Sequence, residues 1–216
     1  MDLGIYHVFN KSIAGYKIFN RRSDYLRMRD LCRYYQICSP PVKFSRYREY
    51  LRVDRLQQKG TFFRDFSGGE NIVRIVAYCL MPTHIHFILQ PMIENGISIF
   101  VAKILNSYTR YFNLKHKRKG PLWESRTKKI LIKTQEQLIH LTRYIHLNPV
   151  TGYLVERPQD WEFSSYLEYL NLIPNEEGIC TFEDLLEINS QTYREFVEDR
   201  ISYQRELAKI KTLLIE

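Results

Sequence analysis

The stretch YCLMPTHIHFILQP, residues 78–91, is an apolar run that contains two histidines separated by one isoleucine. β-Branched and aromatic residues are enriched in this run and just before it, which favours a strand. Residues i and i+2 of a strand share a face, so His84 and His86 should leave the sheet side by side, with Ile85 and Phe87 opposite. Met81-Pro82 interrupts the run, and we interpret it as a bulge or an edge irregularity.

Two neighbouring imidazoles on a rigid element make half of a metal site. The alternative is a half-buried strand with two incidental histidines, because His-x-His is a short pattern. The residues alone leave both interpretations open.

The charge of the chain is unevenly distributed. From Pro174 onward there are 5 Lys+Arg against 10 Asp+Glu, which leaves 27 against 14 for the first 173 of the 216 residues. A basic body of this kind suggests a polyanionic partner such as nucleic acid, and the 16 tyrosines offer stacking surfaces for bases. A solvated basic surface is the alternative.

The sequence also indicates the cellular compartment in which to expect the protein. No apolar run reaches the length of a membrane span, and MDLGIYHVFNKS lacks the apolar centre of a signal peptide. Cys32, Cys38, Cys79 and Cys180 form no CxxC pair, as expected of reduced thiols. We therefore expect an intracellular protein, in the cytoplasm and associated with the nucleoid.

Periodicity and capping residues predict the other elements. Strands are expected at 5–11 and 128–132. Helices are expected from Ser23 or Asp24 to about Ile37, at 43–59 and at 97–114, with a loop at 60–70. His7, in the first strand, could line a site, although a lone strand histidine is more often structural.

A further helix should begin after Thr134, with Gln137 completing a capping box, and should end at Asn148-Pro149. His140, Tyr144 and Asn148 recur every four residues and so form one polar stripe along it.

The first candidates for phosphate contacts are the cations of the segment KHKRKG, residues 115–120. Further candidates for phosphate contacts are Arg110, which lies among aromatic residues, and the exposed pair Arg21-Arg22. The full set of candidate DNA-binding residues is Arg21, Arg22, Arg110, Lys115, Lys117, Arg118 and Lys119.

Four segments, in order, carry a resemblance to a known family: YHVFNK, AYCLMPTHIHFIL, SYTRYFNLKHKRKGPLWESR, and LTRYIHLNPVTGYL followed by WEFSSY. Over roughly residues 5–170 the chain resembles the single-tyrosine transposases of the His-hydrophobe-His class, especially the REP-associated tyrosine transposases. It departs from the family at Thr83, where asparagine is usual, and at residues 40–70, which are longer than in the shortest members.

The resemblance implies an α+β, ferredoxin-like sandwich whose antiparallel sheet carries helices on one face. Residues 1–173 would form the catalytic domain, with 40–70 as an insertion, and 174–216 an acidic, helical C-terminal extension. We expect this extension to inhibit DNA binding modestly because of its charge.

The activity that the resemblance implies is cleavage and rejoining of single-stranded DNA near hairpins through a 5′-phosphotyrosine. Tyr144 matches the nucleophile, and His84, His86 and Asn148 match the ligands of a divalent metal, Mg²⁺ or Mn²⁺. A tyrosine needs activation to attack, and His140 or His146 is a candidate helper, although a structural or solvent role is the more common one for such a histidine. Tyr108 and Tyr111 are rival nucleophiles by their surroundings.

Other functions stay open at this point. The chain could be a hairpin-DNA-binding protein that has lost transposition, a plain metal-dependent nuclease, or an RNA-binding module. A homodimer and a monomer are both compatible with the sequence.

Overall fold

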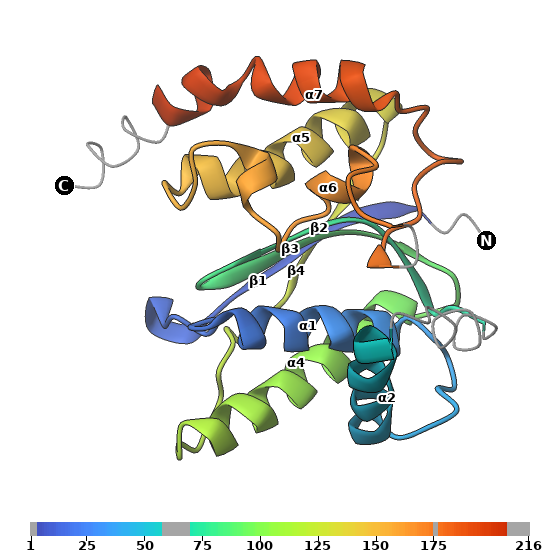
Figure 1. Cartoon of the computed structure of the whole chain (residues 1–216), viewed down its shortest axis with the longest axis vertical. Helices are drawn as coiled ribbons and strands as arrows, with labels where there is room; N and C mark the ends of the chain where they lie inside the picture. The colour runs from blue at the N-terminus through green and yellow to red at the C-terminus, as the bar shows by residue number, and fades with distance from the viewer. Residues whose placement is uncertain (1–3, 58–69, 175–176, 207–216) are drawn as a thin grey trace.

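The computed structural model describes residues 4–57, 70–174 and 177–206. Its sheet has four antiparallel strands, β1 (Ile5–Lys11), β2 (Val73–Met81), β3 (His84–Pro91) and β4 (Lys128–Ile132), in the order β2-β3-β1-β4. Among the described residues, two α-helices lie between β1 and β2 and one lies between β3 and β4, and the strand order is that of the expected ferredoxin-like arrangement (Figure 1).

The run at residues 78–91 is two strands, which corrects the interpretation of Met81-Pro82 as a bulge. Met81 pairs with His84, so Pro82 and Thr83 form the turn of a hairpin. Pro82 has no N–H to contribute to a ladder, and a turn accommodates it where a central strand would not. β3 lies between β2 and β1, so His84 and His86 lie on a central strand.

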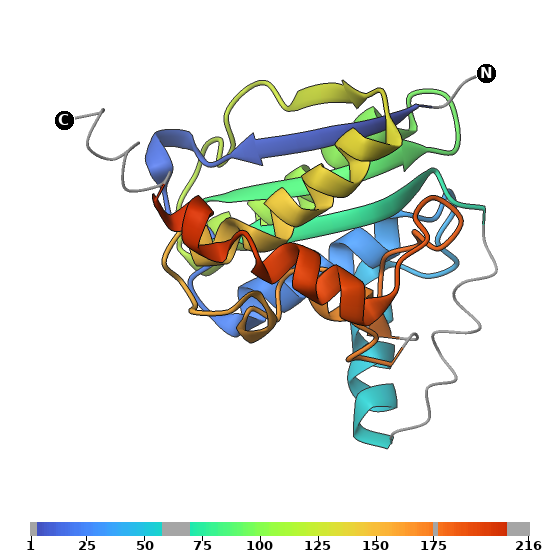
Figure 2. The ribbon, with the colours of Figure 1, turned by 90° about the horizontal axis from the view of Figure 1, so that it is seen from above.

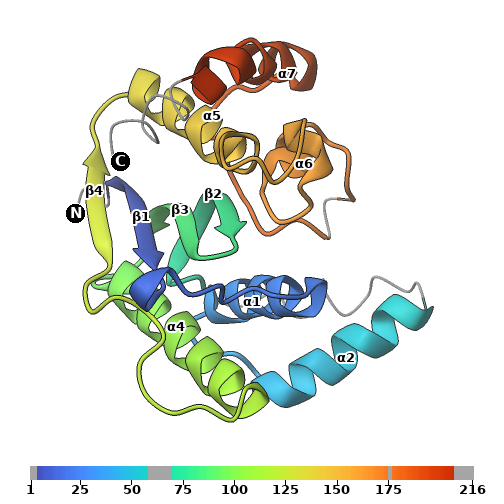
Figure 3. The same ribbon diagram turned by 90° about the vertical axis from the view of Figure 1, so that its left-hand side faces the viewer.

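One face of the sheet is covered by α1 (Arg22–Tyr35) and α4 (Gly96–Lys115), with α2 (Phe44–Gln57) beyond them (Figure 3). Ile85 and Phe87 are buried in this layer, as the strand alternation predicts. The predicted helices are confirmed, although α1 begins at Arg22 and Asp24 caps it from the third position by accepting from the Arg21 N–H. Most of the loop expected at 60–70 lies outside the described residues.

The opposite face carries α5 (Gln135–Thr151), α6 (Tyr166–Tyr169) and α7 (Ser190–Glu198), as Figures 1 and 2 show. Helices on one face therefore describe only the βαββαβ core, and the structure adds a second helical layer. The reason is that Val76, Ala77, Cys79 and Ile88 give this face of the sheet its own apolar surface, which the second layer buries. From the C-terminal extension, Phe182, Leu186, Tyr193 and Val197 join the same cluster.

The helix α5 runs on to Thr151 and does not end at Asn148-Pro149. Proline removes one helical hydrogen bond, its own N–H to the carbonyl four residues back. The turn is held nevertheless, because Gly152 N–H donates to Asn148 O at 2.8 Å and Thr151 Oγ1 donates to Leu147 O at 3.0 Å. Asn148 is therefore held on the helix.

Candidate active site

The two histidines of β3 face the second helical layer. Their ring centroids are 5.1 Å apart, and the rings are close to perpendicular. His86 is buried and His84 is half-buried. The strand alternation predicted from the sequence thus gives the pair a common face, and α5 covers that face.

Tyr144 projects from α5 toward these imidazoles. Its ring centroid lies 5.9 Å from that of His86, edge to face, while 42% of the residue remains exposed. A side chain that touches the histidines on one side and solvent on the other is accessible to a large substrate. The structure thus brings together Tyr144 and the His pair, which lie about sixty residues apart in the sequence.

His7 is a third imidazole of this site. The sequence alone indicated only that His7 could line a site or be structural. It lies on β1, next to β3, and its Nε2 is 3.1 Å from His86 Nδ1. Its ring centroid is 6.4 Å from that of Tyr144. The alternation of IYHVFNK was the signal that could have found it, because His7, Phe9 and Lys11 share one face.

Both histidines of β3 use Nδ1 within the protein. His86 Nδ1 contacts His7, and His84 Nδ1 is 2.9 Å from the Thr83 hydroxyl. Among the described residues, neither Nε2 has a hydrogen-bond partner. With the proton on Nδ1, each Nε2 presents a lone pair, which is the usual arrangement of metal-binding histidines. Thr83, where the family has asparagine, still supplies an oxygen that can accept this bond.

The imidazoles are neutral near pH 7. Burial lowers the pKa of His86 to about 3, with smaller contributions from His84, His7 and Lys11. Burial also lowers the pKa of His84 to about 4, assisted by Lys11, and that of His7 to about 4. Neutral imidazoles are the form that binds a metal.

Asn148 lies one helical turn beyond Tyr144, at the end of α5 that passes the β2–β3 hairpin. A Cβ added at the neighbouring Gly152 would lie 3.2 Å from Met81 Cε, and Met81 is the register partner of His84. The Asn148 Nδ2 is buried without a hydrogen-bond partner, so this end of the amide is not committed to the protein.

These residues suit a divalent ion with mixed nitrogen and oxygen ligands. Within the described part of the chain, no group of three or more His, Cys, Asp or Glu residues is arranged to hold a metal. A ligand of another type, such as the amide of Asn148, would have to complete a site built on His84 and His86.

His140 and His146 do not lie beside Tyr144 as helpers. His146 is fully buried, with Nδ1 2.7 Å from Tyr193 Oη and Nε2 2.7 Å from Ser165 Oγ, and burial lowers its pKa to about 3. His140 is exposed and contacts Arg143 at 2.8 Å. The imidazoles in ring contact with Tyr144 are those of His7 and His86.

The rival tyrosines lie on α4, on the other side of the sheet. Tyr108 is fully buried and donates to Ile18 O at 2.6 Å, and Tyr111 donates to Asp24 Oδ1 at 2.7 Å. Both hydroxyls are committed to the helical layer that faces away from His84 and His86.

The predicted DNA-binding cations lie around α1 and α4, and three of them have partners. Lys115 pairs with the buried Asp24, Arg118 donates to Asn113 Oδ1 and Pro121 O, and Arg22 forms a two-bond ion pair with Glu162 at 2.6 and 2.7 Å. The remaining four, Arg21, Arg110, Lys117 and Lys119, are exposed.

A second set of cations, absent from the sequence-based prediction, lies beside the histidines. Lys11 pairs in register with His84, and Lys128 Nζ is 5.7 Å from the ring centroid of Phe9. Phe9 in turn stacks on His7 and His86, at 4.8 and 5.6 Å between centroids. The histidine face thus has an aromatic and basic border along β1 and β4.

In the part of the chain that the structure describes, no helix has the length and apolar character needed to cross a membrane.

The chain is similar to known transposases. Residues 42–148 match the family model described as IS200-like transposase. A curated relative from Haemophilus influenzae, described as a REP-associated tyrosine transposase, is 31% identical over 101 residues, which are 42% of this chain and 57% of the relative. The chain thus matches little more than half the length of that relative.

The fold has a counterpart among solved structures. The structure of a REP-associated tyrosine transposase bound to a REP hairpin aligns with a TM-score of 0.50 at 17% identity, covering 81% of this chain and 84% of the other. The sheet and its helices are the feature shared with this neighbour. The family model spans 107 of the 216 residues, and over that stretch the chain is similar to the IS200-like transposases.

Proposed function

We propose that this protein cleaves and rejoins single-stranded DNA beside a hairpin through a covalent bond to Tyr144. The observation that carries the proposal is the position of the Tyr144 ring, 5.9 Å from His86 and partly open to solvent. The match to REP-associated tyrosine transposases, one of them solved with a REP hairpin, supports hairpin DNA as the substrate class.

In this reaction Tyr144 Oη attacks phosphorus, a P–Oη bond forms, and the bond from phosphorus to O3′ breaks. The departing O3′ takes up a proton and becomes a free hydroxyl. Reversal by a 3′-hydroxyl restores a phosphodiester without ATP, because the phosphotyrosine conserves the energy of the broken bond.

His84 and His86, through Nε2, and Asn148, through its amide oxygen, are the residues that would hold a divalent metal. Such an ion, when bound, neutralises charge on the non-bridging phosphate oxygens. His7 and Thr83 orient the two imidazoles through Nδ1.

The tyrosine is protonated in the free protein. Burial raises the pKa of Tyr144, and the neighbouring Cys79 raises it slightly further. Attack therefore requires removal of this proton as the substrate binds, and the positive charge of a divalent ion held by His84 and His86 would favour its loss.

The border formed by Phe9, Lys11 and Lys128 supports a path for the cleaved strand along β1 and β4. Lysines attract the phosphates and an aromatic ring offers a surface on which a base can stack. The exposed cations of α4 and the loop after it, on the other layer, would then serve the hairpin.

The test is a cleavage assay with a labelled oligonucleotide that carries a hairpin and unpaired flanks. Tyr144→Phe should abolish cleavage while DNA binding persists, and EDTA should abolish cleavage by the unaltered protein. Tyr153→Phe is the matched control, since Tyr153 is also exposed, at 56%, and follows the same helix. Cleavage that persists in Tyr144→Phe would instead assign the site to a plain nuclease.

A further inference from the structure

Arg27 of α1 is a cation that lacks a counterion within the part of the chain that the structure describes. The residue is half-buried, its Nε is buried without a hydrogen-bond partner, and no hydrogen bond or ion pair joins its guanidinium to another described residue. A charge held partly away from water is costly unless it is paired. Nothing in the proposed reaction uses Arg27, so the cost asks for another explanation.

Two aromatic rings hold the guanidinium in place. Its Cζ lies 4.3 Å from the ring centroid of Tyr111 on α4 and 5.3 Å from that of Phe44 on α2. The Tyr111 ring is itself fixed, because its hydroxyl donates to Asp24 Oδ1 at 2.7 Å. Such contacts engage the face of a guanidinium and leave the N–H groups of its edge available.

The outer end of this guanidinium is open to solvent. Because Arg27 is only half-buried and Nε is the one atom of its side chain that is buried without a partner, Nη1 and Nη2 are the accessible atoms. They carry all the N–H donors of the guanidinium except the one on Nε. Their geometry suits an anion that offers two oxygens side by side, as a phosphate does.

Further cations lie near Arg27. Burial lowers the pKa of Arg27, and the neighbouring Arg48 of α2 lowers it further. On α4, Lys103 Nζ lies 5.9 Å from the ring centroid of Tyr35, a residue of α1. Arg110 is exposed seven residues further along α4, on the same stripe of the helix. We call these four cations the α1–α2–α4 surface.

Two carboxylates of this region are already engaged. Asp24 is buried and pairs with Lys115. Asp30 is also buried, and its Oδ2 accepts from Arg48 Nε at 3.1 Å. Neither carboxylate forms an ion pair with Arg27, so the positive charge of Arg27 is left for a partner from outside the described chain.

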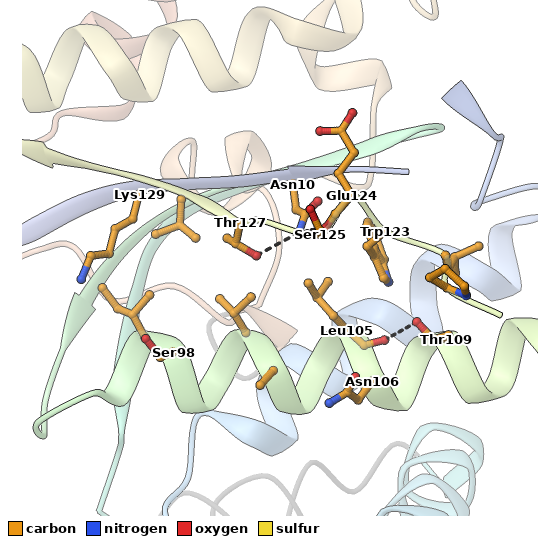
Figure 4. A pocket seen from close by; sticks show the side chains of 16 residues that line it. Asn10, Ser98, Leu105, Asn106, Thr109, Trp123, Glu124, Ser125, Thr127 and Lys129 are labelled. Atoms are coloured by element: carbon orange, nitrogen blue, oxygen red, sulfur yellow. Dashed lines mark hydrogen bonds between the residues drawn. The ribbon is translucent and has the colours of Figure 1, made fainter. Parts of the chain in front are cut away.

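The α1–α2–α4 surface is distinct from the side of α4 that faces the sheet. Leu105 and Thr109 line a cavity between α4 and the β1–β4 side of the sheet (Figure 4). Tyr111 instead contacts Arg27 and Asp24 of α1. An anion on Arg27 would therefore touch the outer helices and reach neither the sheet nor its histidines.

We infer that Arg27 binds a backbone phosphate of the hairpin DNA, an inference that rests on the proposed function. The phosphate offers two oxygens to Nη1 and Nη2 and supplies the negative charge that Arg27 lacks. This helical layer is away from Tyr144 (Figure 3), so it is available to the hairpin while the cleaved strand occupies the histidine face. Helix α2, from the segment expected as an insertion, contributes Phe44 to the site.

Arg27→Met removes the charge and the N–H donors but keeps an apolar side chain beside the two rings. Because the guanidinium has no partner in the free protein, the urea midpoint of the full-length variant should be unchanged or raised. Affinity for a labelled hairpin oligonucleotide should fall about tenfold, and the salt dependence of binding should decrease by roughly one phosphate contact. Arg157→Met is the matched control and should leave affinity unchanged, since Arg157 is 64% exposed, pairs with Asp160 and lies between α5 and α6.

The phosphate can be located by replacing the phosphates of the hairpin one at a time with neutral methylphosphonates. One position should weaken binding to the unaltered protein about as much as Arg27→Met does. The same replacement should cause no further loss in Arg27→Met. Arg27→Lys keeps the charge without the planar pair of Nη groups, so it should preserve the salt dependence and recover only part of the affinity.

Three results would overturn the inference. These are an Arg27→Met variant with the affinity and salt dependence of the unaltered protein, failure of that variant to fold, which would make Arg27 a structural residue, and a methylphosphonate scan in which every effect persists in Arg27→Met. Cleavage at Tyr144 combined with any of them would leave the proposed function intact. Hairpin binding that depends on Arg27 without any cleavage would uphold the inference and count against the proposed function.

Discussion

The hydroxyl of Tyr193 should hold the helix that carries Tyr144, and its removal tests how the C-terminal extension contributes to the fold. Tyr193 lies on α7 and is 3% exposed. Its Oη lies 2.7 Å from His146 Nδ1 and 2.9 Å from Thr142 Oγ1, both on α5. Tyr193→Phe removes this one oxygen and leaves the packing of the ring in place.

The loss of stability in Tyr193→Phe depends on which hydrogen bonds Thr142 and His146 retain in the variant. Thr142 retains a bond to Ile139 O at 2.8 Å, and His146 retains Ser165 on its other nitrogen, but its Nδ1 is left unpaired in full burial. Two lost hydrogen bonds and one orphaned buried nitrogen should together cost about 2–3 kcal/mol. For a chain of this size, that corresponds to a fall in Tm of about 5–10 °C.

The assay is urea and thermal unfolding at pH 7, followed by circular dichroism. Tyr203→Phe is the control, because Tyr203 is 52% exposed and should change the free energy of unfolding by less than about 0.5 kcal/mol. An unfolding free energy for Tyr193→Phe within 0.5 kcal/mol of the unaltered protein would refute the reasoning. In that case, α7 would not restrain α5.

Three further predictions concern the two helical layers and the site. Asp24→Asn should destabilise the protein by roughly 3 kcal/mol at pH 7, because it breaks the buried pair with Lys115. Burial raises the pKa of Asp24, but Lys115, Tyr111 and the backbone N–H groups of Arg21 and Asn20 hold it below its ordinary value. The stabilisation from the ionised carboxylate is thus present above about pH 4 and is lost as the pH falls. In urea titrations, the difference in free energy of unfolding between Asp24→Asn and the unaltered protein should therefore shrink toward pH 3. A difference that does not change with pH would contradict this. His7→Phe should weaken Mn²⁺ binding at least tenfold by calorimetry, since it frees His86 Nδ1; unchanged affinity would remove His7 from the site. Lys11→Ala should weaken cleavage more than hairpin binding, and Lys117→Ala the reverse, which gel shifts and cleavage rates measured on one oligonucleotide will separate.

Much of the fold could be predicted from local patterns. Periodicity predicted the strand at 128–132 and the helices α2 and α4, because this pattern depends only on residues close together in the sequence. The hairpin at Pro82–Thr83 was missed because it lacks the Gly or Asn that usually marks a two-residue turn. The continuation of α5 past Pro149 depends on bonds that the sequence does not display.

For the candidate site, strand alternation predicted that His84 and His86 share a face, and the family resemblance pointed to Tyr144. The structure brings the three rings together, and their roles stay predictions. His7 was not assigned a role because its partner His86 is distant in sequence and meets it only through the pairing of β1 with β3. The same pairing brings Lys11 beside His84. Charge alone marked Lys115 as a DNA contact, while its ion pair with Asp24 depends on the packing of α4 against α1.

The proposed reaction requires that Tyr144 become covalently joined to DNA. The most direct measurement is incubation of the protein with hairpin DNA and Mn²⁺, followed by protease digestion and mass mapping of any peptide that carries a nucleotide. We expect a 5′-phosphodeoxynucleotide on the peptide that contains Tyr144, absent when EDTA is present. Cleaved DNA without any modified tyrosine, or a modification at another tyrosine, would contradict it.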